Sequence, residues 1–130
     1  MSCQTSPFKG YVIEDGGATF LARINGNTGV AITQSLISSI SVKVFDLDSD
    51  TPDTAVYSAS VTVATSVFDT LQTDAIWTED TDGYNFKHAM PASAFAIGNH
   101  NYRIEYLFTP ATGEVFWVLF EVFATNVRTS

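Results

Sequence analysis

The residues best suited to chemistry are the alternating carboxylates of Asp46-Leu47-Asp48-Ser49-Asp50. Aspartates at the first, third and fifth positions of a loop are typical of Ca²⁺ sites, because side chains two residues apart can converge on one ion. The sixth position is Thr51 rather than glycine and the twelfth is Tyr57 rather than glutamate, so the rest of an EF-hand loop is missing. A solvated acidic turn that discourages pairing at a strand end explains the same residues. The three aspartates are a weak calcium candidate, and we expect no metal and no other cofactor.

A second acidic run, Glu79-Asp80-Thr81-Asp82-Gly83, strengthens the metal hypothesis if the two loops meet in space. The chain contains no Lys or Arg between Asp46 and Asp82, although acids are frequent there. One region of the surface is therefore strongly negative, which repels nucleic acid and could steer a basic partner. The same charge also serves to keep an apolar domain in solution.

Catalysis has little support in the residue pattern. Neither His88 nor His100 belongs to a motif such as G-x-S-x-G, H-E-x-x-H or C-x-x-C. Cys3 is the only cysteine, so it cannot form a disulfide within the chain. We expect a protein that is not an enzyme.

Four aromatic residues provide an alternative function. Stacking of sugar rings on exposed aromatic side chains would make the chain a carbohydrate-binding or adhesion module, and the candidates are Trp77, Tyr84, Tyr57 and Tyr11. Aromatic rings more often fill the core of a small β-domain.

The composition limits the class of protein. The chain has 130 residues, of which 45% are hydrophobic and 15% charged, with 14 acidic against 6 basic residues and a net charge of −8. This length suits one domain, and the apolar content is too high for a disordered chain. A basic face for nucleic-acid phosphates is lacking. The longest apolar stretch, Val115 to Phe120, is too short for a membrane helix, and Met1 to Gly10 does not resemble a signal peptide. We expect synthesis in a cytoplasm and binding to neither nucleic acid nor membrane.

Apolar residues alternate with polar ones over most of the chain, which predicts strands with one buried and one solvated face. The clearest runs are Phe20–Ile24, Ile40–Val44, Ala59–Val63, Tyr84–His88 and Tyr102–Phe108. Gly-, Asn-, Asp- and Pro-rich turns separate them, and only Pro91–Phe95 favours a helical turn. The prediction is an all-β, antiparallel sandwich of seven or eight strands. It comprises an N-terminal arm at 1–10, the sandwich at 11–124 and a C-terminal tail at 125–130.

The segment Val115–Phe123 departs from this alternation because both of its faces are apolar. It is either a central strand whose second face is covered by a loop or by the arm, or part of a subunit interface, because monomers rarely expose large apolar patches. Phe45, Leu107 and Trp77 also fall outside the core pattern. The predicted interface residues are Phe116, Trp117, Leu119 and Phe123, together with Phe8 and Tyr11 from the arm.

The C-terminal third carries a family resemblance. Gly83-Tyr84-Asn85-Phe86, then Gly98, Tyr102-Arg103-Ile104-Glu105-Tyr106, Gly113-Glu114 and a final apolar strand resemble the last three strands of an immunoglobulin-like or fibronectin-III-like sandwich. The resemblance implies that Tyr102 forms a tyrosine corner. The chain departs from true immunoglobulin domains because it lacks both core cysteines and the tryptophan of the third strand.

Similar small sandwiches occur among bacteriophage virion proteins, including capsid decoration (cement) proteins and modules of baseplate and tail proteins. The resemblance implies a non-enzymatic structural subunit of a phage or virus particle, most simply a capsid decoration or head/tail accessory protein. Its partners would be other virion proteins, namely capsid or tail subunits, and further copies of itself in a homo-oligomer. It would be located in the virion after synthesis in the host cytoplasm.

Overall fold

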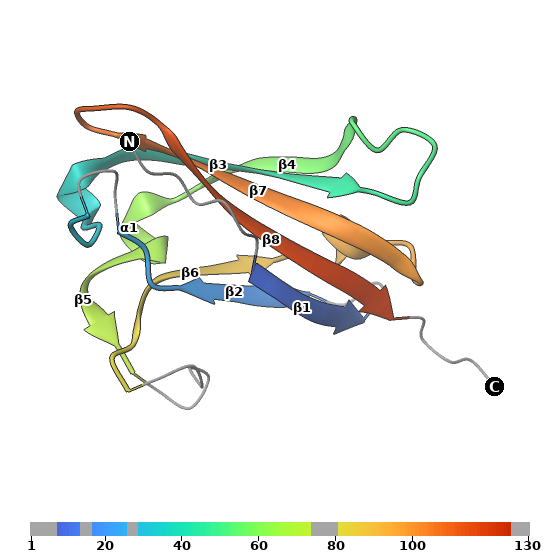
Figure 1. Cartoon of the computed structure of the whole chain (residues 1–130), viewed down its shortest axis with the longest axis horizontal. Helices are drawn as coiled ribbons and strands as arrows, with labels where there is room; N and C mark the ends of the chain where they lie inside the picture. Colours follow the sequence, from blue (N-terminus) through green and yellow to red (C-terminus); the bar gives the residue numbers. More distant parts are fainter. Residues whose placement is uncertain (1–7, 14–16, 26–28, 74–80, 126–130) are drawn as a thin grey trace.

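The computed structural model describes residues 8–13, 17–25, 29–73 and 81–125, and for residues 8–13 the backbone alone. Within these ranges eight strands form two sheets that pack face to face (Figure 1). The larger sheet contains, in spatial order, β1 (Phe8–Ile13), β8 (Phe116–Thr125), β7 (His100–Pro110), β3 (Ile37–Asp46) and β4 (Ala55–Val61). The smaller sheet contains β2 (Ala18–Ala22), β6 (Tyr84–Met90) and β5 (Val67–Gln72).

Three short helical segments connect the strands. They are the 3-10 turn Gln34–Leu36 before β3, the α-helical turn α1 (Val63–Ser66) between β4 and β5, and the 3-10 turn Ala92–Phe95 after β6. The last of these lies within Pro91–Phe95, where a helical turn was predicted. No helix among the described residues is long and apolar enough to cross a membrane.

The strand order is that of an immunoglobulin-like sandwich, because β3, β7 and β8 lie together in one sheet while β2, β5 and β6 form the other. The described neighbours pair antiparallel, with one exception: β1 runs parallel to β8, with Phe8 opposite Phe120 and Tyr11 opposite Phe123. The predicted all-β class and sandwich architecture are confirmed.

The core lies between the sheets and follows the predicted alternation. Ile40, Val42 and Val44 of β3 are buried, whereas Ser41 and Lys43 between them are not. On β7 the inward side chains are all at most 1% exposed, namely Tyr102, Ile104, Tyr106 and Phe108. Phe20, Phe86 and Phe120 surround Tyr106 with ring centroids 5.0–6.3 Å from its own. Aromatic side chains therefore fill most of the space between the sheets.

The resemblance implied a tyrosine corner at Tyr102, and the structure contains one. The Tyr102 hydroxyl donates a hydrogen bond to the Ile97 carbonyl and accepts one from the Ile97 N–H, both at 3.0 Å. The ring packs edge-on against Phe95, with centroids 5.3 Å apart. This contact ties the connection from β6 to the start of β7.

Gly83 is required where the chain enters β6. Its φ of +106° is strained for other residues, and a Cβ atom there would collide with the backbone carbonyl of Gln72. A glycine at this position lets β5 and β6 approach closely.

The strand boundaries differ from the prediction in three places. Strand β1 begins at Phe8, inside the predicted arm, because the backbone from Phe8 to Ile13 pairs with β8. Val63, predicted as strand, is the first residue of α1. Strand β5 was not predicted, because only Val67 of its six residues is buried and the apolar alternation is therefore missing.

Candidate protein interface

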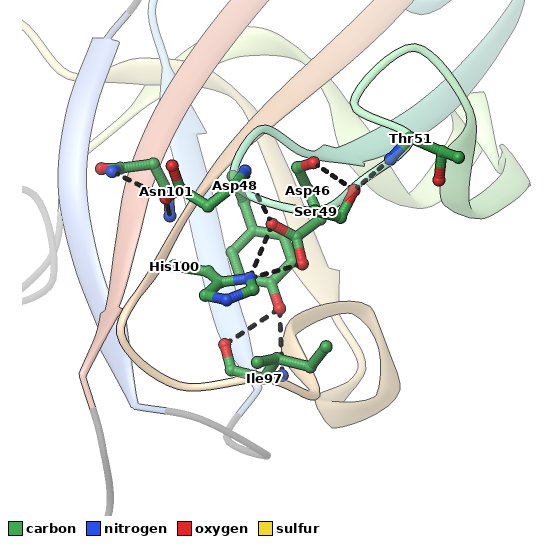
Figure 2. Close-up of polar contacts among 8 residues, drawn as sticks. Asp46, Asp48, Ser49, Thr51, Ile97, His100 and Asn101 are labelled. Carbon is green, nitrogen blue, oxygen red and sulfur yellow. Dashed lines mark hydrogen bonds and ion pairs between the residues drawn. The ribbon is translucent and has the colours of Figure 1, made fainter.

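The acidic turn that follows β3 is tied to the first residues of β7 (Figure 2). The carboxylate of Asp46 is 1% exposed, and its two oxygens lie 2.7 and 2.9 Å from Nδ1 of His100. A carboxylate can only accept, so Nδ1 carries the proton that it donates. The Asp46 side chain also accepts the Asp48 N–H at 3.0 Å. Asp46 thus joins two segments that are 54 residues apart in sequence.

Asp48 makes the second link of this turn. Its Oδ2 atom accepts the Asn101 backbone N–H at 2.6 Å and the Asn101 side-chain amide at 3.1 Å. These hydrogen bonds, the backbone one foremost, hold the pKa of Asp48 below its ordinary value because they favour the carboxylate. Ser49 donates its hydroxyl to the Asp46 carbonyl at 2.9 Å and closes the turn.

This geometry does not bring the three aspartates of the calcium candidate together. The carboxylates of Asp46 and Asp48 are directed to His100 and Asn101 instead of converging with Asp50 on one point. Within the described ranges, no three His, Cys, Asp or Glu side chains form a group that could hold a metal ion. In the second acidic run, Asp82 lies 3.9 Å from Arg23. Glu79 and Asp80 lie outside the described residues.

The other histidine has an aromatic partner. Nδ1 of His88 on β6 lies 2.8 Å from the hydroxyl of Tyr106 on β7. Burial lowers the pKa of His88 and raises that of Tyr106 well above its ordinary value, because both charged forms lose hydration. The neutral imidazole and the phenol hydroxyl share a hydrogen bond, and the pair links the two sheets. This arrangement is structural.

Of the aromatic side chains proposed for sugar binding, the two that the structure describes are not well exposed. Tyr84 is 2% exposed, and Tyr57 is half-buried against the core. Trp77 and the side chain of Tyr11 lie outside the described residues. Trp117, which was assigned to the interface rather than to sugar binding, is well exposed at 43%.

Strand β8 separates its side chains between the core and the outer face of the larger sheet. Phe116 points inward, is 7% exposed and stacks on Phe108 at 5.1 Å, so its predicted place in an interface is wrong. A side chain next in sequence points the opposite way. Trp117, Leu119 and Phe123 accordingly lie on the outer face, where they are exposed or half-buried.

Apolar side chains of the outer face are opposite apolar, polar or charged residues on the neighbouring strands. Trp117 on β8 is directly opposite Leu107 on β7. Phe45 on β3 is opposite Arg103, and Leu119 is opposite Glu105. We define the outer face by the outward side chains Phe45, Leu107, Trp117, Leu119 and Phe123 and the four charged residues among them. Leu107 and Phe45, which fell outside the core pattern, belong to it.

The charges of the four charged residues on the outer face cancel. Lys43 is opposite Glu105, and Arg103 is opposite Glu121. Arg103 Nε also lies 3.5 Å from Glu105 Oε2. Among the side chains that the structure describes, two basic and two acidic residues make this face neutral, whereas the chain carries −8. Their role was missed in the sequence, although each alternates with a core residue on β3, β7 or β8.

The remaining two predicted interface residues, Phe8 and Tyr11, are on β1. Their backbone pairs with β8 and extends the larger sheet beyond it. Their side chains lie outside the described part of the chain. Comparison with protein-family models, with curated proteins and with solved structures gave no match to this chain.

Proposed function

We propose that this chain is a non-enzymatic structural subunit of a phage or virus particle and that its outer face binds neighbouring protein subunits. The observation that carries the proposal is the neutral, half-apolar outer face of a protein with a charge of −8. Trp117, at one end of this face, is 43% exposed and stands beside Leu107. Protein interfaces are enriched in such aromatic residues, and charged residues are depleted at their buried centre.

The distribution of charge supports binding at this face. Asp48, Asp50 and Asp53 lie in the turn between β3 and β4, away from the rows that cross the middle of the sheet. Desolvating the outer face therefore removes no net charge from water, because its charges occur in opposite pairs. A partner subunit with an apolar centre and balanced charge fits this surface.

The histidines support a role without catalysis. His100 is held by Asp46, and Ser49 beside it donates its hydroxyl to a backbone carbonyl. His88 is held by Tyr106 in the sandwich. Neither arrangement brings a serine hydroxyl to an imidazole, as nucleophilic catalysis would need.

The proposal is tested by incorporation into particles. The gene is kept in its native genome, particles are purified by density gradient, and the copy number of the chain per particle is measured by quantitative mass spectrometry. The expected result is a stoichiometric copy number for wild type and at least a tenfold lower one for Trp117→Glu. Leu71→Glu is the matched control, because Leu71 is equally exposed at 42% but lies on the smaller sheet.

Two results would overturn the proposal. One is the absence of the wild-type chain from purified particles while it accumulates in the unassembled fraction. The other is equal incorporation of the Trp117 and Leu71 variants, which would place any contact elsewhere.

A further inference from the structure

Strand β4 is the last strand of the larger sheet and pairs with β3 alone. Val56 is a bulge, because its neighbours Ala55 and Tyr57 lie opposite consecutive residues of β3. From Tyr57 to Val61 the pairing with β3 is regular. In the described part of the chain, no element bonds the other side of this stretch. Its outward backbone groups are therefore open to an added strand.

The side chains of β4 leave this edge accessible. The strand contains no charged residue, no proline and no glycine. Ser58 and Ser60 are exposed and small, and Val56 at the bulge is 49% exposed. The bulge protects only the start of the edge. A strand that pairs beyond it meets short side chains and no charge that would repel it.

The turn before β4 is acidic and lacks basic partners. Asp48, Asp50 and Asp53 are exposed there, and Figure 1 shows the turn at the tip of the β3–β4 hairpin. The sequence contains no lysine or arginine between residues 46 and 82. None of the lysine and arginine side chains that the structure describes forms an ion pair with these three aspartates. A negative potential therefore lies directly beside the open edge.

We infer that the edge of β4 binds an extended segment of a partner protein as an added antiparallel strand, with basic residues beside the acidic turn. Main-chain hydrogen bonds to the stretch Tyr57–Val61 hold the segment, as in other cases of strand addition. The charge of the turn selects a basic segment from other extended chains. This contact lies at the edge of the sheet and is independent of the function proposed for the outer face.

The position of the turn sets the order of residues in the partner segment. The antiparallel direction is favoured because it pairs slightly more stably per residue than the parallel one. The turn precedes β4, so an antiparallel strand ends beside it. The basic residues of the segment therefore follow its paired part. At the other end of β4, the segment 62–66 is uncharged and attracts no charged residue.

The test uses the purified full chain and a synthetic peptide with blocked ends. The peptide has alternating threonine and valine residues followed by two lysines. Isothermal titration should show saturable binding with a dissociation constant below about 1 mM. A peptide with two glutamates in place of the lysines should bind about fivefold more weakly or not at all. A lysine peptide that is N-methylated along its threonine and valine residues should not bind, because it cannot donate main-chain hydrogen bonds.

Variants of the chain test the location. Asp50→Asn combined with Asp53→Asn should weaken binding of the lysine peptide about fivefold. The matched control removes the same charge elsewhere, by Asp82→Asn combined with Glu114→Gln, and should bind like wild type. Amide hydrogen exchange should show new protection in β4 on binding. Trp117→Glu should bind the peptide like wild type, which separates this contact from the outer face.

Four results would overturn the inference. The first is no binding of the lysine peptide, and the second is equal binding of the lysine and glutamate peptides. The third is equal weakening by the two double variants. The fourth is new protection from exchange in β2 or β5 instead of β4, which would place the peptide on the smaller sheet.

Discussion

His88 on β6 and Tyr106 on β7 meet across the sandwich, with Nδ1 and the phenol oxygen 2.8 Å apart. Because burial lowers the pKa of His88 below its ordinary 6.5, the folded protein favours the neutral imidazole. The unfolded chain then binds more protons between the two pKa values. The contribution of His88 to stability is complete above about pH 6.5 and is lost as the pH falls below it.

The first prediction follows from this pair. His88→Gln, which keeps a group able to bond the Tyr106 hydroxyl, should reduce the fall in melting temperature between about pH 7 and pH 5. Lys87→Gln, one residue away, should keep the wild-type fall. Thermal melts across this pH range measure the difference. Equal pH dependence in wild type and His88→Gln would show that His88 does not titrate with folding.

The second prediction concerns the tyrosine corner. Tyr102→Phe keeps the ring against Phe95 but leaves the Ile97 N–H and carbonyl without the hydroxyl. We expect a loss of about 1–2 kcal/mol in the free energy of unfolding, measured by urea denaturation. Tyr102→Leu also removes the ring packing and should cost more. A Tyr102→Phe variant that is as stable as wild type would mean that water replaces the hydroxyl without loss of stability.

The third prediction concerns the buried side chain of Asn85. The sequence analysis did not predict that it bonds the backbone of Ile24. Its Oδ1 accepts the Ile24 N–H at 2.8 Å, and its amide donates to the Ile24 carbonyl at 2.9 Å. Asn85→Leu buries an unpaired N–H and should cost about 1–3 kcal/mol in urea denaturation. The exposed Asn101→Ala should cost under about 1 kcal/mol. Similar losses of stability in Asn85→Leu and Asn101→Ala would contradict the structural role given to the Asn85 hydrogen bonds.

The fourth prediction concerns the buried contact between Asp46 and His100. In a double-mutant cycle of Asp46→Asn and His100→Gln, the coupling energy should be about 0.5–3 kcal/mol, as for residues in direct contact. Chemical denaturation of the four proteins gives this value. Additive effects would indicate that the contact does not contribute to stability.

The fifth prediction concerns calcium. Millimolar Ca²⁺ should leave the melting temperature unchanged relative to a chelator, because Asp46 and Asp48 already bond His100 and Asn101. A ligand that binds only the native state must raise its stability. An increase in melting temperature that Asp50→Asn abolishes would restore the calcium site.

The sequence predicted the features that depend on neighbours along the chain. The alternation of Ile40, Val42 and Val44, and of Tyr102 to Phe108, identified two central strands and their buried faces, because side chains of a strand alternate between its faces. Strand β5 escaped prediction because an edge strand with one buried residue has no apolar period to detect.

The composition and period of the sequence determined the all-β class and the presence of an apolar surplus in Val115–Phe123, whereas the family resemblance implied the tyrosine corner. Only the tertiary structure decided that Phe116 faces the core and Trp117 the outer face, because a shift of one residue exchanges the faces of a strand apolar on both sides. It alone decided that Asp46 meets His100. Contacts between residues 54 positions apart depend on how the sheets assemble, which no local pattern records.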